Sequence, residues 1–267
     1  MPELPDVENF KYCLENTCLS KSIVDISTTD KNLIKKITFK DFRNKLIGHK
    51  FKSAFRRGKF LIVEIDGIPE KLVIHFGMTG DFQYVRSSEK PSLVANVTFK
   101  FDDNSELRWL NRRKLGKIYL VKELADVKLL KQMGPEPLKL SKKDFLDLLA
   151  KNENMNIKAF MLDQTIIAGI GNVYSDEILY QSKINPHKKI KDLSKQKRDL
   201  IYEKMKKILK DAPNYLSKYT PEGLVRKPFP KSWLISSRYQ MKCPLGHKLK
   251  RETIAGRPAR WCPVCQK

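Results

Sequence analysis

The C-terminal tail carries side chains whose types and spacing suit a metal ion. Cys243 and His247 are separated by three residues, fourteen residues follow, and Cys262 and Cys265 are separated by two. Each pair brackets a tight turn, so four ligands can converge on one tetrahedral zinc ion and leave no open position for catalytic water. We expect one structural Zn²⁺, without which so short a segment would hardly fold. An unmetallated tail is the alternative.

The first residues, MPELPDVE, raise a different question. An acidic start is typical of a helix N-terminus, because carboxylates offset the positive end of the helix dipole. That interpretation accounts for Asp6 and Glu8. It does not explain Pro2 or Glu3.

Three further segments have both a functional and a structural interpretation. The GIGN turn at 169–172 is a weak phosphate motif, but at a helix start its backbone N–H groups and the Asn172 side chain could receive a phosphate. The alternative is that the glycines only allow the chain to turn. The basic turns RRGKF at 56–60 and NRRKLGK at 111–117 are equally compatible with solvated charge. A lone histidine in a β segment, as at His75, is more often satisfied within the core.

The charge of the chain points to a polyanionic partner. Across 267 residues, 53 Lys and Arg oppose 30 Asp and Glu, which leaves a formal charge of +23 spread along the sequence. Because neutralising phosphates releases condensed counterions, nucleic acid is the first choice and an anionic membrane surface the second. No apolar run is long enough to span a membrane, and the start lacks the pattern of a signal peptide. We expect a soluble intracellular monomer, and we interpret Cys13 and Cys18 as buried thiols.

Hydrophobic periodicity predicts the elements that position these residues. Val7, Phe10 and Leu14 share one face of an N-terminal helix, and short β-branched segments between Ser22 and Val121 predict a mostly antiparallel β-sandwich. A capping box at Ser141 opens a helical region. A second long helix is expected from about Leu193 to Lys210, and the four prolines from Pro213 to Pro230 predict a loop or linker. The fold class is α+β, with domains at 1–132, 133–230 and 231–267.

Taken together, the motifs resemble the formamidopyrimidine-DNA glycosylase and endonuclease VIII family of base-excision repair enzymes. PELPDVE, RRGKF, HFGMTG, RRKLG, IKAFMLDQTIIAGIGNVYSDE and CPVCQ stand in the family's order along the whole chain. PELP in place of PEGP favours the formamidopyrimidine branch. The resemblance implies a bifunctional glycosylase and abasic-site lyase acting on damaged double-stranded DNA, with a helix-two-turn-helix and a zinc hairpin.

The resemblance also assigns roles to individual residues. Pro2, once Met1 is removed, is the amine nucleophile that forms a Schiff base at the sugar C1′; a retained Met1 would make it an amide. Glu3 is the acid/base partner and Lys59 assists at the phosphodiester. The implied DNA-backbone contacts are His75, Lys158, Asn172 and Arg257. The residues implied to fill the space left by the extruded base are Met78, Arg113 and Leu115.

Three departures from the family pattern bear on substrate choice. Leu115 stands where the formamidopyrimidine branch usually has Phe, and the zinc ligands are Cys-His-Cys-Cys in place of four cysteines. The segment 220–243 is shorter than the family stretch that covers a flipped 8-oxoguanine. We therefore expect formamidopyrimidines and abasic sites to be favoured over 8-oxoguanine. An endonuclease VIII-like preference for oxidised pyrimidines, or a zinc-containing DNA-binding protein without chemistry, are the alternatives.

Overall fold

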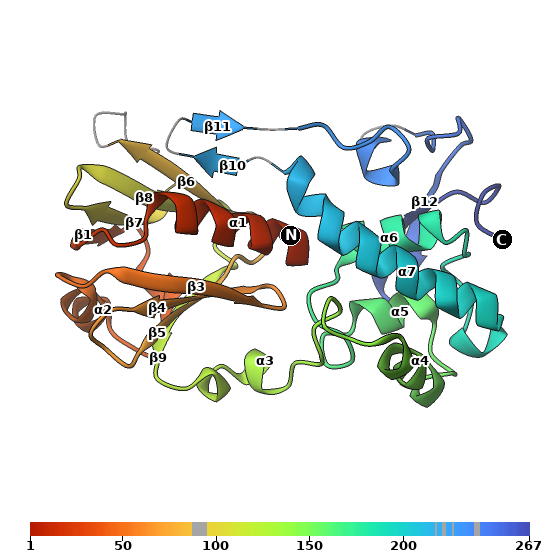
Figure 1. Cartoon of the computed structure of the whole chain (residues 1–267), viewed down its shortest axis with the longest axis horizontal. Helices are drawn as coiled ribbons and strands as arrows, with labels where there is room; N and C mark the ends of the chain where they lie inside the picture. Colours follow the sequence, from red (N-terminus) through yellow and green to blue (C-terminus); the bar gives the residue numbers. More distant parts are fainter. Residues whose placement is uncertain (87–94, 217, 221–222, 226, 238–240) are drawn as a thin grey trace. The chain divides into compact units, whose positions relative to one another are not determined.

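The computed structural model describes residues 1–86, 95–216, 218–220, 223–225, 227–237 and 241–267; Figure 1 labels its elements. Two compact units make up the chain. The first comprises Met1–Pro2, Asp6–Gln132 and Ser217–Arg226, and the second Glu3–Pro5, Met133–Leu216 and Lys227–Lys267. The predicted α+β class is confirmed, whereas the division into three domains at residues 132 and 230 stays a prediction.

Two β-sheets form the body of the first unit. Their strand orders are β1-β7-β8-β6 and β2-β9-β5-β4-β3. The strands are β1 (Ile23–Thr28), β2 (Ile34–Lys35), β3 (Phe51–Arg57), β4 (Phe60–Ile65), β5 (Lys71–His75), β6 (Gly80–Arg86), β7 (Ala95–Phe101), β8 (Ser105–Asn111) and β9 (Lys117–Val121). Apart from the parallel pair β2–β9, neighbouring strands in these two sheets are antiparallel. The predicted sandwich is therefore confirmed.

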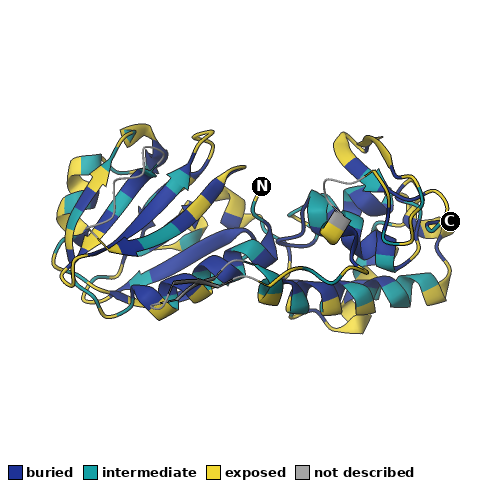
Figure 2. Cartoon of the chain, turned by 90° about the horizontal axis from the view of Figure 1, so that it is seen from above, coloured by how far each residue is buried: buried dark blue, intermediate teal, exposed yellow. Residues whose placement is uncertain are grey.

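One hydrophobic core takes side chains from both sheets and from helices α1 (Leu4–Thr17) and α2 (Phe39–Leu46). Buried residues, dark blue in Figure 2, run along the strands. In α1 the apolar positions 7, 10 and 14 are all buried, as their spacing predicts. Helix α2 was not expected from the sequence. It forms because Thr38 caps its N-terminus, with its side chain accepting from Asp41 N, and because Phe42 and Leu46 are buried one turn apart.

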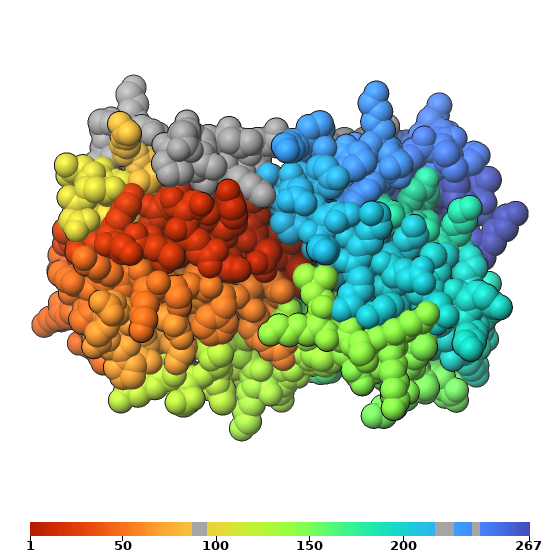
Figure 3. Space-filling view, in the orientation of Figure 1, coloured from red at the N-terminus to blue at the C-terminus, as the bar shows by residue number. Residues whose placement is uncertain are grey.

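The second unit is built from helices around its own core. Ser141 caps α4 as predicted, its side chain accepting from Asp144 N, and Ser194 caps α7 in the same way. The face of α7 shown in cyan in Figure 3 is open to solvent, while Ile201, Met205 and Ile208 on its other face are buried. The elements are α4 (Lys142–Lys151), α5 (Ile157–Leu162), α6 (Asn172–Gln181), α7 (Lys195–Asp211), β12 (Lys250–Ile254) and β13 (Arg257–Trp261).

Short elements connect these parts. They are η1 (Lys31–Leu33), η2 (Leu124–Asp126), α3 (Lys128–Lys131), η3 (Ile190–Asp192), η4 (Ala212–Tyr215), β10 (Lys218–Thr220), β11 (Gly223–Val225) and η5 (Leu234–Ser237). The segment from 213 to 230, predicted as a loop or linker, also contains the antiparallel pair β10 and β11. No helix among the described residues is long and apolar enough to cross a lipid bilayer.

Candidate functional site

The carboxylate of Glu3 is bound at the N-terminus of α6. Its oxygens accept from Gly171 N at 2.8 Å, Val173 N at 2.8 Å and Tyr174 N at 3.1 Å, and the side chain is 2% exposed. The first N–H groups of a helix lack partners within the helix and lie at its positive end, so a carboxylate is well placed there. Glu3 is therefore held rigidly, directly after the half-buried Pro2.

Gly171 makes this close approach possible, because a Cβ at this position would lie 2.3 Å from Glu3 Cδ. The same contact corrects one expectation for the GIGN turn. Gly171 N of this turn and the N–H groups of Val173 and Tyr174 that follow it bind Glu3 and are not open to a phosphate. The side chain of Asn172 is half-buried, and among the described residues its Oδ1 has no hydrogen-bond partner. Asn172 as a phosphate ligand stays a prediction.

The RRGKF turn is packed into the first unit, so its basic residues are more than a solvated loop. Arg56 is 7% exposed at its side chain and donates from Nε to Glu8 Oε2 at 2.9 Å, which links β3 to α1. Burial by itself raises the pKa of Glu8, but Lys11 and Arg56 together hold it below its usual value. Lys59, in the turn between β3 and β4, is 7% exposed.

His75 ends β5, between Phe60 of β4 and Lys117 of β9. Its ring centroid lies 4.7 Å from that of Phe60. Burial, followed by the charges of Lys59 and Lys117, lowers the pKa of His75 to about 4. The imidazole is therefore neutral at pH 7 and can contact a phosphodiester only as a neutral hydrogen-bonding group.

The structure brings the three predicted space-filling residues together on two interlocked turns. Met78 is 44% and Leu115 47% exposed, and Arg113 is also exposed. Arg113 N donates to Thr79 Oγ1 at 3.0 Å. Gly77 has φ +60°, and a Cβ there would lie 2.5 Å from the backbone N of residue 116. The two turns therefore lie against each other and carry all three side chains.

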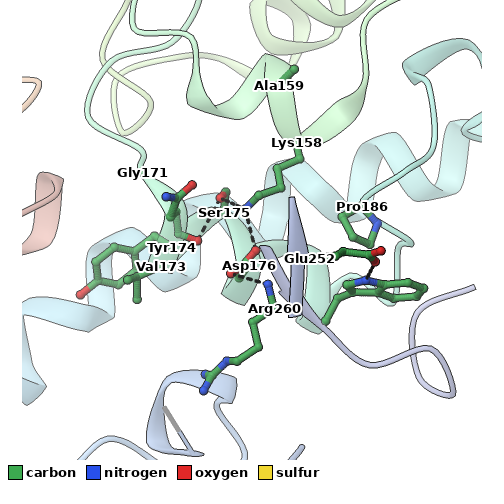
Figure 4. Close-up of polar contacts among 12 residues, drawn as sticks. Lys158, Ala159, Gly171, Val173, Tyr174, Ser175, Asp176, Pro186, Glu252 and Arg260 are labelled. Atoms are coloured by element: carbon green, nitrogen blue, oxygen red, sulfur yellow. Dashed lines mark hydrogen bonds and ion pairs between the residues drawn. The ribbon is translucent and has the colours of Figure 1, made fainter. Parts of the chain in front are cut away.

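Lys158 has a different environment from the one its predicted role implies. Its side chain is fully buried, and its Nζ contacts Asp176 Oδ1 at 2.6 Å and Ser175 Oγ at 3.1 Å (Figure 4). Burial raises the pKa of Asp176 to about 6, against the lowering effect of Lys158. Lys158 thus compensates an internal carboxylate, and direct phosphate binding by its ammonium group stays a prediction.

The hairpin β12–β13 and the first turns of α6 line a pocket of about 390 Å³. Asn172 and Asp176 line it from α6, and Arg251 and Arg260 from the hairpin. Arg257, predicted to contact phosphate, begins β13 and is exposed. The pocket therefore carries basic and acidic side chains together, with Glu252 of the hairpin and Asp176 of α6 beside the two arginines.

Cys243, His247, Cys262 and Cys265 converge at the end of the second unit, with all four ligand atoms within 4.8 Å of one another. Cys243 Sγ lies 3.6 Å from His247 Nδ1 and 3.9 Å from Cys265 Sγ, and His247 Nδ1 lies 3.3 Å from Cys265 Sγ. Tetrahedral zinc with ordinary bond lengths separates such ligands by roughly 3.5 to 3.8 Å. These residues fit the ion, and the predicted structural zinc site is confirmed.

A second set of bonds fixes the zinc site to the helices. Gln266, 1% exposed, accepts from Cys262 N at 2.8 Å and donates to Ile184 O at 2.9 Å. Tyr180 of α6 packs against the same cluster as Cys243 and Cys262. Gln266 and Tyr180 therefore attach the zinc-site residues to α6 and to the loop that follows it.

Sequence reasoning missed three residues that organise these sites: Asp176, Thr79 and Arg56 as the partner of Glu8. Asp176 stands four residues after Asn172, a spacing that places both on one side of α6. That spacing was the one available signal for Asp176, and it did not identify the buried lysine that pairs with it.

Comparisons with known proteins cover both units. A family model described as "Formamidopyrimidine-DNA glycosylase N-terminal domain" matches residues 1–118, and one described as "Formamidopyrimidine-DNA glycosylase H2TH domain" matches residues 133–218. A formamidopyrimidine-DNA glycosylase of Desulfitobacterium hafniense is 32% identical over 275 residues, covering 100% of both chains.

Solved structures of a Lactococcus lactis protein named Fpg are also similar. Its complex with DNA containing an abasic site has a TM-score of 0.83 and 28% identity, covering 99% of each chain. Its complex with DNA containing an oxidised pyrimidine has a TM-score of 0.84 and 29% identity, covering 100% of each chain.

Proposed function

This chain belongs to the formamidopyrimidine-DNA glycosylase family, and from that premise we propose how it removes oxidised bases from double-stranded DNA and cuts the strand at the resulting abasic site. Family membership confirms the resemblance found in the sequence. The protein is a base-excision repair glycosylase with abasic-site lyase activity and a structural zinc site.

The contact between Glu3 and α6 is the observation that supports the catalytic assignment most directly. Three main-chain donors hold the carboxylate in one orientation, and Pro2 is its covalent neighbour. A group that transfers a proton during the reaction must be held close to the reacting atoms. The Glu3 carboxylate can transfer a proton, and it is held next in the chain to the candidate nucleophile Pro2.

The proposed chemistry begins with removal of Met1, which exposes the secondary amine of Pro2. An α-amino group has an ordinary pKa of about 8, so a usable neutral fraction exists at pH 7. The amine attacks the sugar C1′, the damaged base leaves, and an iminium ion forms. That cation acidifies the C2′ protons, and loss of one of them expels the 3′ phosphate in β-elimination. The conjugated iminium that results acidifies the C4′ proton, whose loss expels the 5′ phosphate in δ-elimination. Glu3 moves the proton as the sugar ring opens, and Lys59 assists at the phosphodiester.

DNA binding is assigned to groups in both units. His75, Lys158, Asn172 and Arg257 are proposed as backbone contacts. Met78, Arg113 and Leu115 are proposed to fill the space left by the extruded base, because unstacking a nucleotide costs a few kcal/mol that inserted side chains partly offset. The interlocked turns that carry the three inserted residues support this assignment.

Formamidopyrimidines and abasic sites are the proposed preferred substrates, with 8-oxoguanine the poorer purine. That preference rests on the short segment 220–243, part of which lies outside the described residues. Oxidised pyrimidines are the second candidate class, because the similar Lactococcus lactis protein forms a complex with DNA containing one. Action on DNA makes the protein intracellular and DNA-associated, and we propose that it works in the cytoplasm and nucleoid, or in the nucleus of a eukaryotic cell.

Borohydride trapping tests the nucleophile. Reduction of a mixture of the protein and abasic-site DNA is expected to give a covalent adduct, because the iminium becomes a stable amine. Intact-mass analysis must first show that Met1 is absent. The matched control is the same chain with an uncleaved N-terminal extension, which blocks the amine and should give no adduct. An adduct of equal yield from the blocked chain would refute Pro2 as nucleophile, and no adduct from either would favour a non-catalytic DNA-binding protein.

A lesion panel then tests the substrate. Duplexes carrying a formamidopyrimidine, 8-oxoguanine, thymine glycol or dihydrouracil should be cut in single turnover, with the formamidopyrimidine fastest. Faster release of 8-oxoguanine opposite cytosine would refute the proposed order, and faster release of the pyrimidines would favour the second class.

A further inference from the structure

The carboxylate of Asp176 joins three separate elements of the second unit. Asp176 lies on α6, and its Oδ1 contacts Lys158 Nζ of α5 at 2.6 Å. Its Oδ2 accepts from the main-chain N of Arg260 of β13 at 3.1 Å. Figure 4 shows these contacts meeting at one side chain.

Two of the predicted DNA-backbone contacts, Asn172 and Arg257, stand at short, fixed distances along the chain from this junction. Asn172 precedes Asp176 by four residues on α6, about 6 Å along a helix axis. Arg257 precedes Arg260 by three residues on β13, about 10 Å along a strand. Between the two elements lies the pocket lined by Asn172 and Arg260. The position of the hairpin on α6 therefore sets the spacing of the two contacts.

Lys158 favours the ionised form of Asp176, which is the form that can accept from both Lys158 and the main chain of Arg260. The lysine has no exposed side-chain surface and Asp176 only 13%. A buried carboxylate without a cation would bind a proton and become a weaker acceptor. Among the described residues, Glu3 lies near Asp176 and its carboxylate opposes the ionisation of Asp176. Arg251, Glu252 and Arg260 line the same pocket, and the side chain of Arg260 donates to Leu234 O at 2.6 Å.

We propose that Asp176 is a positioning residue for DNA binding: paired with the buried Lys158, it holds strand β13 on helix α6 so that Asn172 and Arg257 meet the DNA backbone at a fixed spacing. This inference rests on the proposed function, because it needs those two residues to be DNA contacts. Asp176 itself touches neither the sugar nor the base in this scheme. Its loss should therefore change affinity and leave the chemical step intact.

The test compares wild type and Asp176→Asn, both zinc-loaded full-length chains. The amide is nearly isosteric, but it removes the negative charge and cannot accept from both Lys158 and Arg260. Affinity is measured by fluorescence anisotropy on a duplex with an uncleavable abasic-site analogue. Strand cleavage of a natural abasic site is measured in single turnover with saturating enzyme. We expect Kd to rise about tenfold and the saturated cleavage rate to stay within about twofold of wild type.

Two further variants separate positioning from general effects. Asp199→Asn removes the same charge from a carboxylate of α7 that pairs with Lys142 at 3.1 Å, and it should bind DNA at least as tightly as wild type. Asp176→Glu keeps the charge opposite Lys158 and moves the carboxylate by one methylene, so it should remain folded and show an intermediate Kd. It decides the question if Asp176→Asn does not fold.

The outcomes are distinct. A Kd unchanged in the folded variants, or a fall in saturated cleavage without a change in Kd, overturns the positioning role. An equal rise in Kd for Asp199→Asn overturns it as well, since charge alone would then explain the effect. If wild type gives no borohydride adduct, the proposed function has failed, whereas an adduct from wild type with no affinity change in the variants removes this inference alone.

Discussion

Acidification is expected to destabilise the first unit through His75. The pKa of His75 lies at about 4, below its ordinary 6.5, chiefly because the ring is buried and secondarily because Lys59 and Lys117 are near. Between these two pH values the unfolded chain binds a proton that the folded chain does not. The free energy of unfolding therefore falls as the pH drops from 6.5 towards 4, and this contribution is fully present above pH 6.5.

The magnitude follows from the shift. Each pH unit of difference is worth about 1.4 kcal/mol, so the loss reaches about 2 kcal/mol at pH 5 and about 3 kcal/mol below pH 4. Urea unfolding at pH 7 and pH 5, followed by tryptophan fluorescence, measures it. The matched variant His75→Gln keeps a neutral hydrogen-bonding side chain that cannot be protonated in this range. The stability lost between the two pH values should be about 2 kcal/mol smaller for His75→Gln than for wild type.

Comparison with His75→Gln also removes the contribution of zinc release in acid, which is common to both chains. An NMR titration of the His75 ring provides a direct check and should show no midpoint above pH 5. Equal losses of stability in both chains, or a ring that titrates near pH 6.5, would show that burial does not exclude the proton.

Three other changes have clear expected results. Thr79→Val removes the acceptor for Arg113 N and should slow release of a damaged base about fivefold, because roughly one hydrogen bond is lost. Cleavage of a preformed abasic site by this variant, and both reactions of Thr79→Ser, should stay near wild type. Equal slowing of base release and abasic-site cleavage would contradict this prediction. Gly171→Ala places a Cβ against Glu3 and should lower the yield of the borohydride adduct at least about tenfold. The zinc content of this variant should be unchanged. An adduct yield equal to that of wild type would show that the reaction tolerates displacement of Glu3. Chelation of zinc should weaken binding to duplex DNA, and added Zn²⁺ should restore it, because so short a segment needs the metal to fold. A DNA-binding anisotropy signal that the chelator does not change would contradict this prediction.

Local patterns in the sequence determined much of the fold and the chemistry. Val7, Phe10 and Leu14 predicted the buried face of α1 because helical periodicity depends on spacing alone, and Ser141 predicted a helix start because its cap is made within three residues. The zinc ligands were identifiable for the same reason, since each pair brackets one tight turn. These features were predictable because their partners are neighbours in the chain.

Only the tertiary structure decided which polar groups meet across long sequence separations. It placed Glu3 on the N–H groups of α6, so that they do not face an open phosphate site, and it buried Lys158 against Asp176. It also joined Thr79 to Arg113 across two turns. The residue type alone does not tell whether a carboxylate or a lysine lies in solvent or in the core. The packing of the folded chain determines its environment and the charge that lies opposite it.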